Sequence, residues 1–94
     1  MENPDMKEII IDCAGITTPL GMHAAMAQAM AFPGWYGCNL DALYDCLTEV
    51  TEQTHLTLVH TQDLGLFMAG FRKVLQDASQ ANHRLHVTVL DTSL

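Results

Sequence analysis

The spacing of apolar residues divides the chain into segments that favour strands and segments that favour helices. Residues 7–14 have a β-branched apolar centre followed by Gly15, a pattern typical of a buried strand. Residues 56–60 and 85–90 instead alternate apolar and polar positions, as strands with one buried face do. The sequence therefore predicts three strands.

The first two helices have recognisable start signals. Thr18 followed by proline predicts a helix that begins near Thr18 and ends before Pro33. Asn39 is a good N-cap because its side chain can accept a hydrogen bond from the first turn, and it predicts a helix over residues 40–51. Two helices therefore follow the first strand without a strand between them.

A third helical pattern covers residues 63–81, but its start is less well defined. Gly65 and Gly70 fall inside it, and each glycine costs up to about 1 kcal/mol relative to Ala in a helix. One helix, two short helices, or a loop followed by a helix all fit this segment. The predicted order is β-α-α-β-α-β, and strands joined by helical crossovers favour a parallel sheet with helices on its faces. We expect one α/β domain over residues 1–94, with three parallel strands and three to four helices.

Composition and charge narrow the class of partner. The 94 residues are 49% hydrophobic and 16% charged, which suits a folded domain rather than a disordered chain. The formal net charge of -7 argues against binding to nucleic acid or to an anionic membrane, because both are bound mainly through Lys and Arg. The three cysteines cannot all pair within the chain, and we expect a cytoplasmic location.

The most distinctive segment joins an aromatic turn to the predicted helix over residues 40–51. On that helix the core-facing residues are predicted to be Leu43, Cys46, Leu47 and Val50, and the opposite face carries Asp41, Asp45, Thr48 and Glu52. An acidic stripe is usually only a solvated helix face, and that interpretation is the simplest alternative.

Two observations favour recognition of a cationic protein over a merely solvated face. No Lys or Arg occurs from Glu8 to Phe71, although seven acidic residues do, so the acidic helix lacks the bases that ordinarily accompany such a stripe. The stripe is also flanked by Trp35, Tyr36 and Tyr44, aromatic residues of the kind enriched at interface centres. We therefore predict a protein-binding site here.

The same segment resembles the signature of the barstar family, intracellular inhibitors of the secreted bacterial ribonuclease barnase. The residues that carry the resemblance are Pro33-x-x-Tyr36-Gly37-x-Asn39-Leu40-Asp41-Ala42-Leu43-x-Asp45-Cys46-Leu47-Thr48. A second, weaker similarity is that of Phe71-x-x-Val74-Leu75-Gln76-Asp77-Ala78 to the family's last helix. The resemblance implies a barstar-like fold whose second helix and preceding loop block a ribonuclease active site.

The resemblance also implies roles for individual residues. Carboxylates would stand in for RNA phosphates, with Asp45 as the central contact, Asp41 beside it and Trp35 stacking from the loop. Asp77 would be a further acidic contact. The full set of expected partner-binding residues is Trp35, Tyr36, Gly37, Asn39, Asp41, Tyr44, Asp45, Thr48 and Asp77. The expected partner is a basic protein, a secreted guanyl-type bacterial ribonuclease, bound by a monomer that acts as an immunity protein without catalytic residues, metal or cofactor.

Some positions depart from the family pattern and keep a second hypothesis open. The family typically has Tyr where this chain has Trp35, and Glu where it has Cys38. It typically has Trp at the positions of both Tyr44 and Val50. The changes at Cys38 and Val50 remove a charge and an indole, so the fold could instead serve an interaction module that regulates another basic protein or toxin.

A small acidic enzyme is the third alternative. Asp41 and Asp45 with Glu49 could serve acid-base chemistry or hold Mg²⁺, but Glu49 lies to the side of the pair and no phosphate-binding glycine loop accompanies them. Cys38 or Cys46 with a histidine could form a nucleophile, yet acidic neighbours would raise rather than lower the pKa of a thiol. His55, His83 and His86 lack the spacing of a zinc site.

Overall fold

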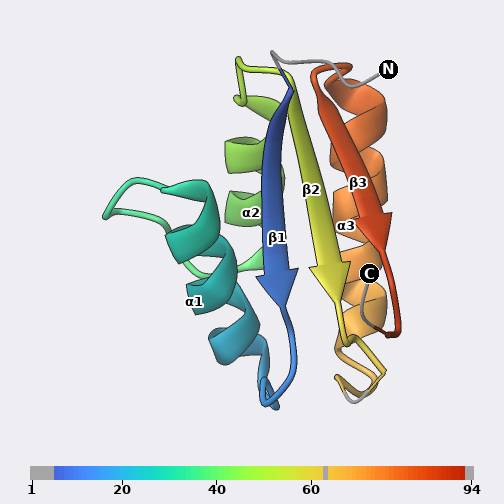
Figure 1. The fold of residues 1–94 in the computed structure, drawn as a ribbon. Helices are drawn as coiled ribbons and strands as arrows, with labels where there is room; N and C mark the ends of the chain where they lie inside the picture. The colour runs from blue at the N-terminus through green and yellow to red at the C-terminus, as the bar shows by residue number, and fades with distance from the viewer. Residues whose placement is uncertain (1–5, 63, 93–94) are drawn as a thin grey trace.

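The computed structural model describes residues 6–62 and 64–92. Within this part of the chain the elements are β1 (Lys7–Asp12), α1 (Pro19–Met30), α2 (Leu40–Thr48), β2 (Thr54–Val59), α3 (Met68–Ala81) and β3 (Leu85–Val89). The strands form one parallel sheet in the order β1-β2-β3 (Figure 1). The predicted order β-α-α-β-α-β and the α/β class are therefore confirmed.

The helices cover one face of this sheet, and the core lies between the two layers. Figure 1 shows α2 and α3 behind the strands and α1 beside β1. The inward rows of the sheet include Ile11 opposite Leu58, and both belong to one core cluster with residues of all three helices. The fully buried members are mostly large apolar side chains, among them Met22, Met26, Leu43, Leu47, Leu56, Leu58, Phe71, Leu75 and Leu85.

Within residues 6–62 and 64–92, no helix covers the other face of the sheet, which corrects the prediction of a buried first strand. β1 is an edge strand whose side chains alternate between the core and solvent, and Ile10 is 54% exposed. On this open face, His55 lies between Glu8 and Thr88, with distances of 3.0 Å from Nδ1 to the Glu8 carboxylate and 2.8 Å from Nε2 to the Thr88 hydroxyl. β1 is covered on its core side only, because the three helices all pack on the core face of the sheet.

Two acid–histidine pairs stabilise this open face. Besides Glu8 and His55, the carboxylate of Asp12 lies 2.9 Å from Nδ1 of His60 and accepts a hydrogen bond of 3.0 Å from the backbone N–H of Ala14. The hydrogen bond with His60 is the largest of the effects that lower the pKa of the Asp12 carboxyl. The first pair joins β1 to the start of β2, and the second joins the end of β1 to the residue that follows β2.

Of the three possibilities left open for residues 63–81, the described residues form a loop followed by one helix. α3 begins at Met68, and residues 64–67 precede it in a bend and a turn, while Asp63, where the helical pattern begins, lies outside the described residues. Gly65 has φ of 78°, the left-handed conformation that glycine adopts readily, so it belongs to the turn. Gly70 is inside the helix, where a Cβ would come within 3.0 Å of Leu40 Cδ1. Among the described residues, no helix is long and apolar enough to cross a membrane.

The buried side chain of Asn82 joins the end of α3 to the end of α2. Its Nδ2 group donates to the carbonyl oxygens of Leu47, Thr48 and Val50 at 3.1, 3.4 and 2.9 Å. Its Oδ1 accepts from the backbone N–H of Arg84 at 3.0 Å, immediately before β3. Carbonyls at a helix end lack partners within the helix, and this side chain supplies donors to those of Thr48 and Val50. For Leu47 it is a second donor, because that carbonyl also accepts from the Val50 N–H at 3.3 Å.

We predict that replacing Asn82 with Ala lowers the free energy of unfolding by about 2 kcal/mol or more, because it leaves several backbone groups without partners in a buried site. Ser79→Ala on the same helix is the matched control, since the Ser79 hydroxyl donates only to Gln76 of its own helix. Urea unfolding of both variants measures the difference. Equal losses in the two variants would contradict the role given to Asn82.

Candidate partner-binding site

The helix that carries the acidic residues begins where the sequence predicts. Asn39 is the N-cap of α2: its Oδ1 accepts from the backbone N–H of Ala42 at 2.8 Å. Its Nδ2 donates to the carbonyl of Gly37 at 3.3 Å, which ties the preceding loop to the helix. Asn39 was expected among the partner-binding residues, and both polar ends of its side chain are used within the chain.

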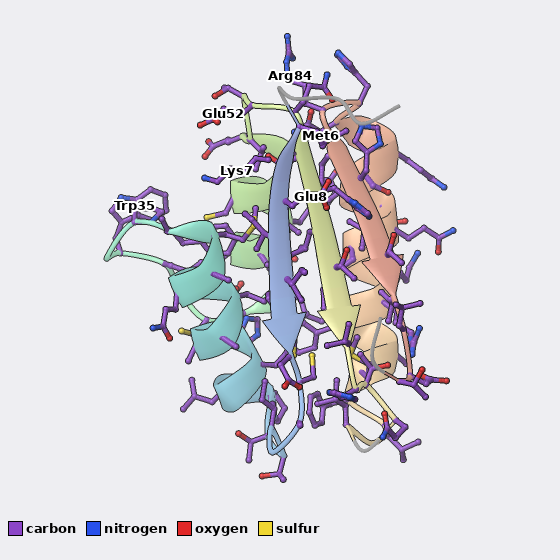
Figure 2. The ribbon with its side chains drawn as sticks, viewed as in Figure 1. Met6, Lys7, Glu8, Trp35, Glu52 and Arg84 are labelled. Atoms are coloured by element: carbon purple, nitrogen blue, oxygen red, sulfur yellow. The ribbon has the colours of Figure 1, made fainter. Side chains whose placement is uncertain are left out.

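The loop before α2 presents one aromatic side chain to solvent. The backbone N–H of Tyr36 donates to the carbonyl of Pro33 at 3.0 Å and closes a turn with Trp35 near its centre. Trp35 is 74% exposed, and Figure 2 shows its ring projecting from the tip of this loop, away from the helices. The loop then continues through Gly37, where a Cβ would lie 3.0 Å from Asn39 Nδ2, and Cys38, which has φ of 52°.

Tyr36, expected to face the partner, instead points into the protein. It is 9% exposed, and its hydroxyl lies 2.6 Å from Nδ1 of His23 on α1. Burial is the main cause that raises the pKa of Tyr36 to about 12, and burial also lowers the pKa of His23 below its ordinary value. The two aromatic residues of the turn therefore have opposite orientations, Trp35 outward and Tyr36 inward.

The two faces of α2 differ as predicted over most of the helix. Leu43, Cys46 and Leu47 are buried. Asp41 and Asp45 are exposed, as is Tyr44 at 36%. The Thr48 hydroxyl donates to the carbonyl of Asp45 at 3.0 Å, one turn back along the helix. Within the described residues, no Lys, Arg or His forms an ion pair with Asp41, Asp45 or Glu49.

The end of α2 comes earlier than predicted, which changes the membership of its acidic face. The helix ends at Thr48 with Glu49 as its C-cap, rather than at residue 51. Glu52 therefore lies beyond the helix, in the connection to β2, and Figure 2 shows it near the amino ends of the strands. Val50 also lies beyond the helix and is only partly buried. The acidic face of the helix itself consists of Asp41 and Asp45.

A groove between α2 and α3 brings Asp77 close to this face. It has a volume of about 590 Å³ and is lined by Leu40, Asp41, Tyr44, Val74, Asp77, Gln80 and Ala81. Asp77 also pairs with Lys73 of its own helix at 3.3 Å. The structure thus places three of the expected residues, Asp41, Tyr44 and Asp77, around one groove, although Asp77 is far from the other two in sequence.

The cysteines are poorly suited to nucleophilic chemistry. All three are free thiols, with Cys13 and Cys46 buried and Cys38 exposed. Burial, followed by the charges of Glu49 and Asp45, raises the pKa of the Cys46 thiol. Burial followed by the charge of Asp12 does the same for the pKa of Cys13. Over residues 6–62 and 64–92, no group of three or more His, Cys, Asp or Glu is placed to hold a metal ion.

Comparison with known proteins places this surface in a family. Residues 6–91 match the family described as barstar, the barnase inhibitor. The chain belongs to the barstar family. A relative from Bacillus subtilis (strain 168), named "Putative ribonuclease inhibitor YrdF", is 35% identical over 81 residues, which cover 80% of this chain and 88% of that protein. The match includes all three strands and all three helices described above.

The most important residue that sequence reasoning missed in this barstar-family chain is His23. It lies on α1, between Met22 and Met26, and is 4% exposed. Its ring packs on that of Phe71 with centroids 4.7 Å apart. A lone polar residue among apolar neighbours on a helix is the signal that could have pointed to a buried histidine, but its partner Tyr36 lies 13 positions away and only the fold brings them together.

We predict that Asn39→Ala lowers the free energy of unfolding of this barstar-family chain by about 1 kcal/mol, the usual effect of removing an N-cap side chain. Asn39→Asp keeps an oxygen acceptor for the Ala42 N–H and places a negative charge at the helix N-terminus, so it should retain most of the stability. Thermal and urea unfolding followed by circular dichroism compare the three proteins. A loss in Asn39→Asp as large as that in Asn39→Ala would argue against the cap.

Proposed function

We propose that this chain is a binding protein that inhibits a ribonuclease by covering its active site with α2 and the loop of residues 33–38. The observation that carries the proposal is that the outward face of α2 has exposed carboxylates without an ion-pair partner among the described residues, and that the loop leading into this helix carries an exposed tryptophan. Membership of the barstar family and similarity to a protein named as a ribonuclease inhibitor support it.

The mechanism we propose is imitation of RNA by carboxylates. A ribonuclease binds its substrate with cationic groups that contact phosphates, and an exposed carboxylate offers the same charge and the same kind of hydrogen-bond acceptor. Asp45, near the middle of the outward face, would meet the catalytic cations, with Asp41 one turn before it. Trp35, raised on the loop, would stack on the enzyme surface where an RNA base would lie.

The groove between α2 and α3 offers a place for one basic side chain of the enzyme. Leu40 and Val74 provide apolar surface for its aliphatic part, and Asp41 and Asp77 provide carboxylates for its charge. The enzyme base would compete with Lys73 for Asp77. That competition costs little, because an exposed ion pair such as Lys73–Asp77 contributes at most about 1 kcal/mol.

The partner we propose is a secreted guanyl-type ribonuclease of bacteria, inhibited in the cytoplasm of the cell that makes it by a monomer of this chain. The formal charge of -7 supports a basic partner through complementarity, and it favours rapid encounter with a positively charged enzyme. In this role the chain is an immunity protein and performs no catalysis itself.

A second candidate function is regulation of another basic protein or toxin with the same fold. The exposed, uncharged Cys38 favours it, because the family typically has Glu at this position of the loop. Affinity capture of partners from native cells at low and high salt distinguishes the two functions, since the second requires a partner without ribonuclease activity that still needs Trp35, Asp41 and Asp45.

We predict that Asp45→Ala weakens binding to barnase by about 30-fold or more, the effect expected for a central hot spot. Glu49→Ala is the matched control: it removes the same charge from the C-cap of the same helix, to the side of the proposed contact, and should weaken binding by less than about fivefold. Inhibition titrations with RNA substrate measure both. Wild-type affinity in Asp45→Ala would contradict the mechanism.

We also predict that association slows steeply as salt rises while dissociation changes little. Attraction between separated opposite charges is screened over about 8 Å at 0.15 M salt, whereas contacts within a formed complex are screened much less. Stopped-flow association at several salt concentrations tests this for barnase. An association rate independent of salt would exclude steering by the acidic surface.

A further inference from the structure

We infer that His23 is a positioning residue for the loop of residues 33–38, and that its neutral imidazole holds Tyr36 inward so that Trp35 faces outward. The effect of His23 on binding rests on the proposed function, since the loop is part of the surface proposed to bind a ribonuclease. The arrangement of the loop itself does not depend on any partner.

The connection between the two aromatic residues is short. Tyr36 and Trp35 are adjacent, and the Tyr36 N–H donates to the Pro33 carbonyl at 3.0 Å, so these residues form one closed turn. Any backbone rotation that turned Tyr36 outward would also turn the peptide that it shares with Trp35. The orientation of the exposed indole is therefore set in part by whatever holds the Tyr36 ring in place.

Ring packing and one hydrogen bond hold that ring. The Tyr36 ring packs on Phe32, with centroids 4.9 Å apart, and on His23, with centroids 5.8 Å apart. The His23 ring in turn packs on Phe71 of α3 at 4.7 Å. The Tyr36 hydroxyl, at the polar end of the ring, lies 2.6 Å from His23 Nδ1. This contact joins the loop to α1.

The protonation state of His23 determines which way this hydrogen bond can run. A neutral imidazole with its proton on Nε2 has a lone pair on Nδ1, which accepts from the Tyr36 hydroxyl. Because Tyr36 has a raised pKa, its hydroxyl keeps its proton and needs such an acceptor. An imidazolium has protons on both nitrogens, so Nδ1 could only donate to the hydroxyl oxygen, and the hydroxyl proton would need another acceptor.

The surroundings favour the neutral form. His23 is 4% exposed, and within the described residues no carboxylate pairs with it. The titratable groups that act on its partner Tyr36 are the thiols of Cys38 in the loop and Cys46 on α2, and burial raises the pKa of the Cys46 thiol. Burial lowers the pKa of His23 from its ordinary value of 6.5.

The sign of the pH dependence follows from that shift. Below pH 6.5 an unfolded or released His23 binds a proton more readily than the packed one does. The stabilisation that the packed arrangement gives to the loop is therefore complete above this pH. It is lost as the pH falls through the lower pKa of the folded protein. We therefore expect the loop to be held most firmly at neutral pH and less firmly as the pH falls below 6.5.

Trp35 is the only tryptophan of the chain, so its fluorescence reports on this loop without any partner. His23→Leu removes the acceptor, and His23→Asn keeps an oxygen near the position of Nδ1 but cannot be protonated. We expect faster local depolarisation of Trp35 fluorescence in His23→Leu than in the wild type at pH 7.5, with His23→Asn close to the wild type. On acidification the wild type should change below pH 6.5, whereas His23→Asn should not show this transition.

The same comparison controls for titration of the other histidines. His55, His60, His83 and His86 remain in both variants, so a transition that they cause would persist in His23→Asn. Thermal unfolding of each variant fixes a temperature at which all are folded. Equal depolarisation in the wild type and His23→Leu, or an acid transition unchanged in His23→Asn, would overturn the inference.

A double-mutant cycle with barnase as the probe connects the loop to binding. His23→Leu should speed dissociation by about 2- to 10-fold, the range that corresponds to one hydrogen bond. The same replacement should have little effect in a Trp35→Ala background and its full effect in an Asp45→Ala background, since only Trp35 depends on the loop. Equal effects in both backgrounds would overturn the assigned role in binding. If barnase and related ribonucleases bind none of the variants nor the wild type, the proposed function fails, and the fluorescence result still decides the positioning role.

Discussion

The attachment of α2 at both of its ends is the constraint on which the rest of the surface depends. A helix of nine residues is too short to be stable alone, so α2 requires fixed ends and a packed face. Asn39 satisfies the first turn, Asn82 satisfies the carbonyls at the other end, and Leu43 and Leu47 pack in the core. Because Asn82 belongs to the end of α3, the same contact sets how α2 lies against α3 and hence how wide the groove between them is.

Much of the fold could be predicted from local signals in the sequence. The order of elements, the start of α1 after Thr18 and the cap at Asn39 depend on residues close to each other in the chain, and these predictions were confirmed. The end of α2 depends on more distant contacts. Asn82 receives the last carbonyls of α2 from more than 30 residues away, so the sequence pattern continued the helix to residue 51.

The site was predictable where it depends on helical period and less so where it depends on the loop. The outward positions of Asp41 and Asp45 follow from the spacing of Leu43, Cys46 and Leu47 on one helix. Tyr36 and Trp35 are adjacent aromatic residues in a loop, where no periodicity indicates which of them faces solvent. Tyr36 turns inward to pack on Phe32 and His23, contacts that no local pattern indicates, and the grouping of Asp77 with Asp41 likewise required the packing of α3 on α2.

The sheet that is covered on one side gives the molecule two surfaces of different chemistry, back to back. The open side carries Glu8, Ile10, Asp12 and His55, while the acidic face of α2 lies on the far side of the helical layer. An attachment made through the open side, such as a fluorescent label, a surface tether or a fused domain, is separated from the α2 face by the full thickness of the core. The fold therefore allows the chain to be held by one surface while the other remains accessible.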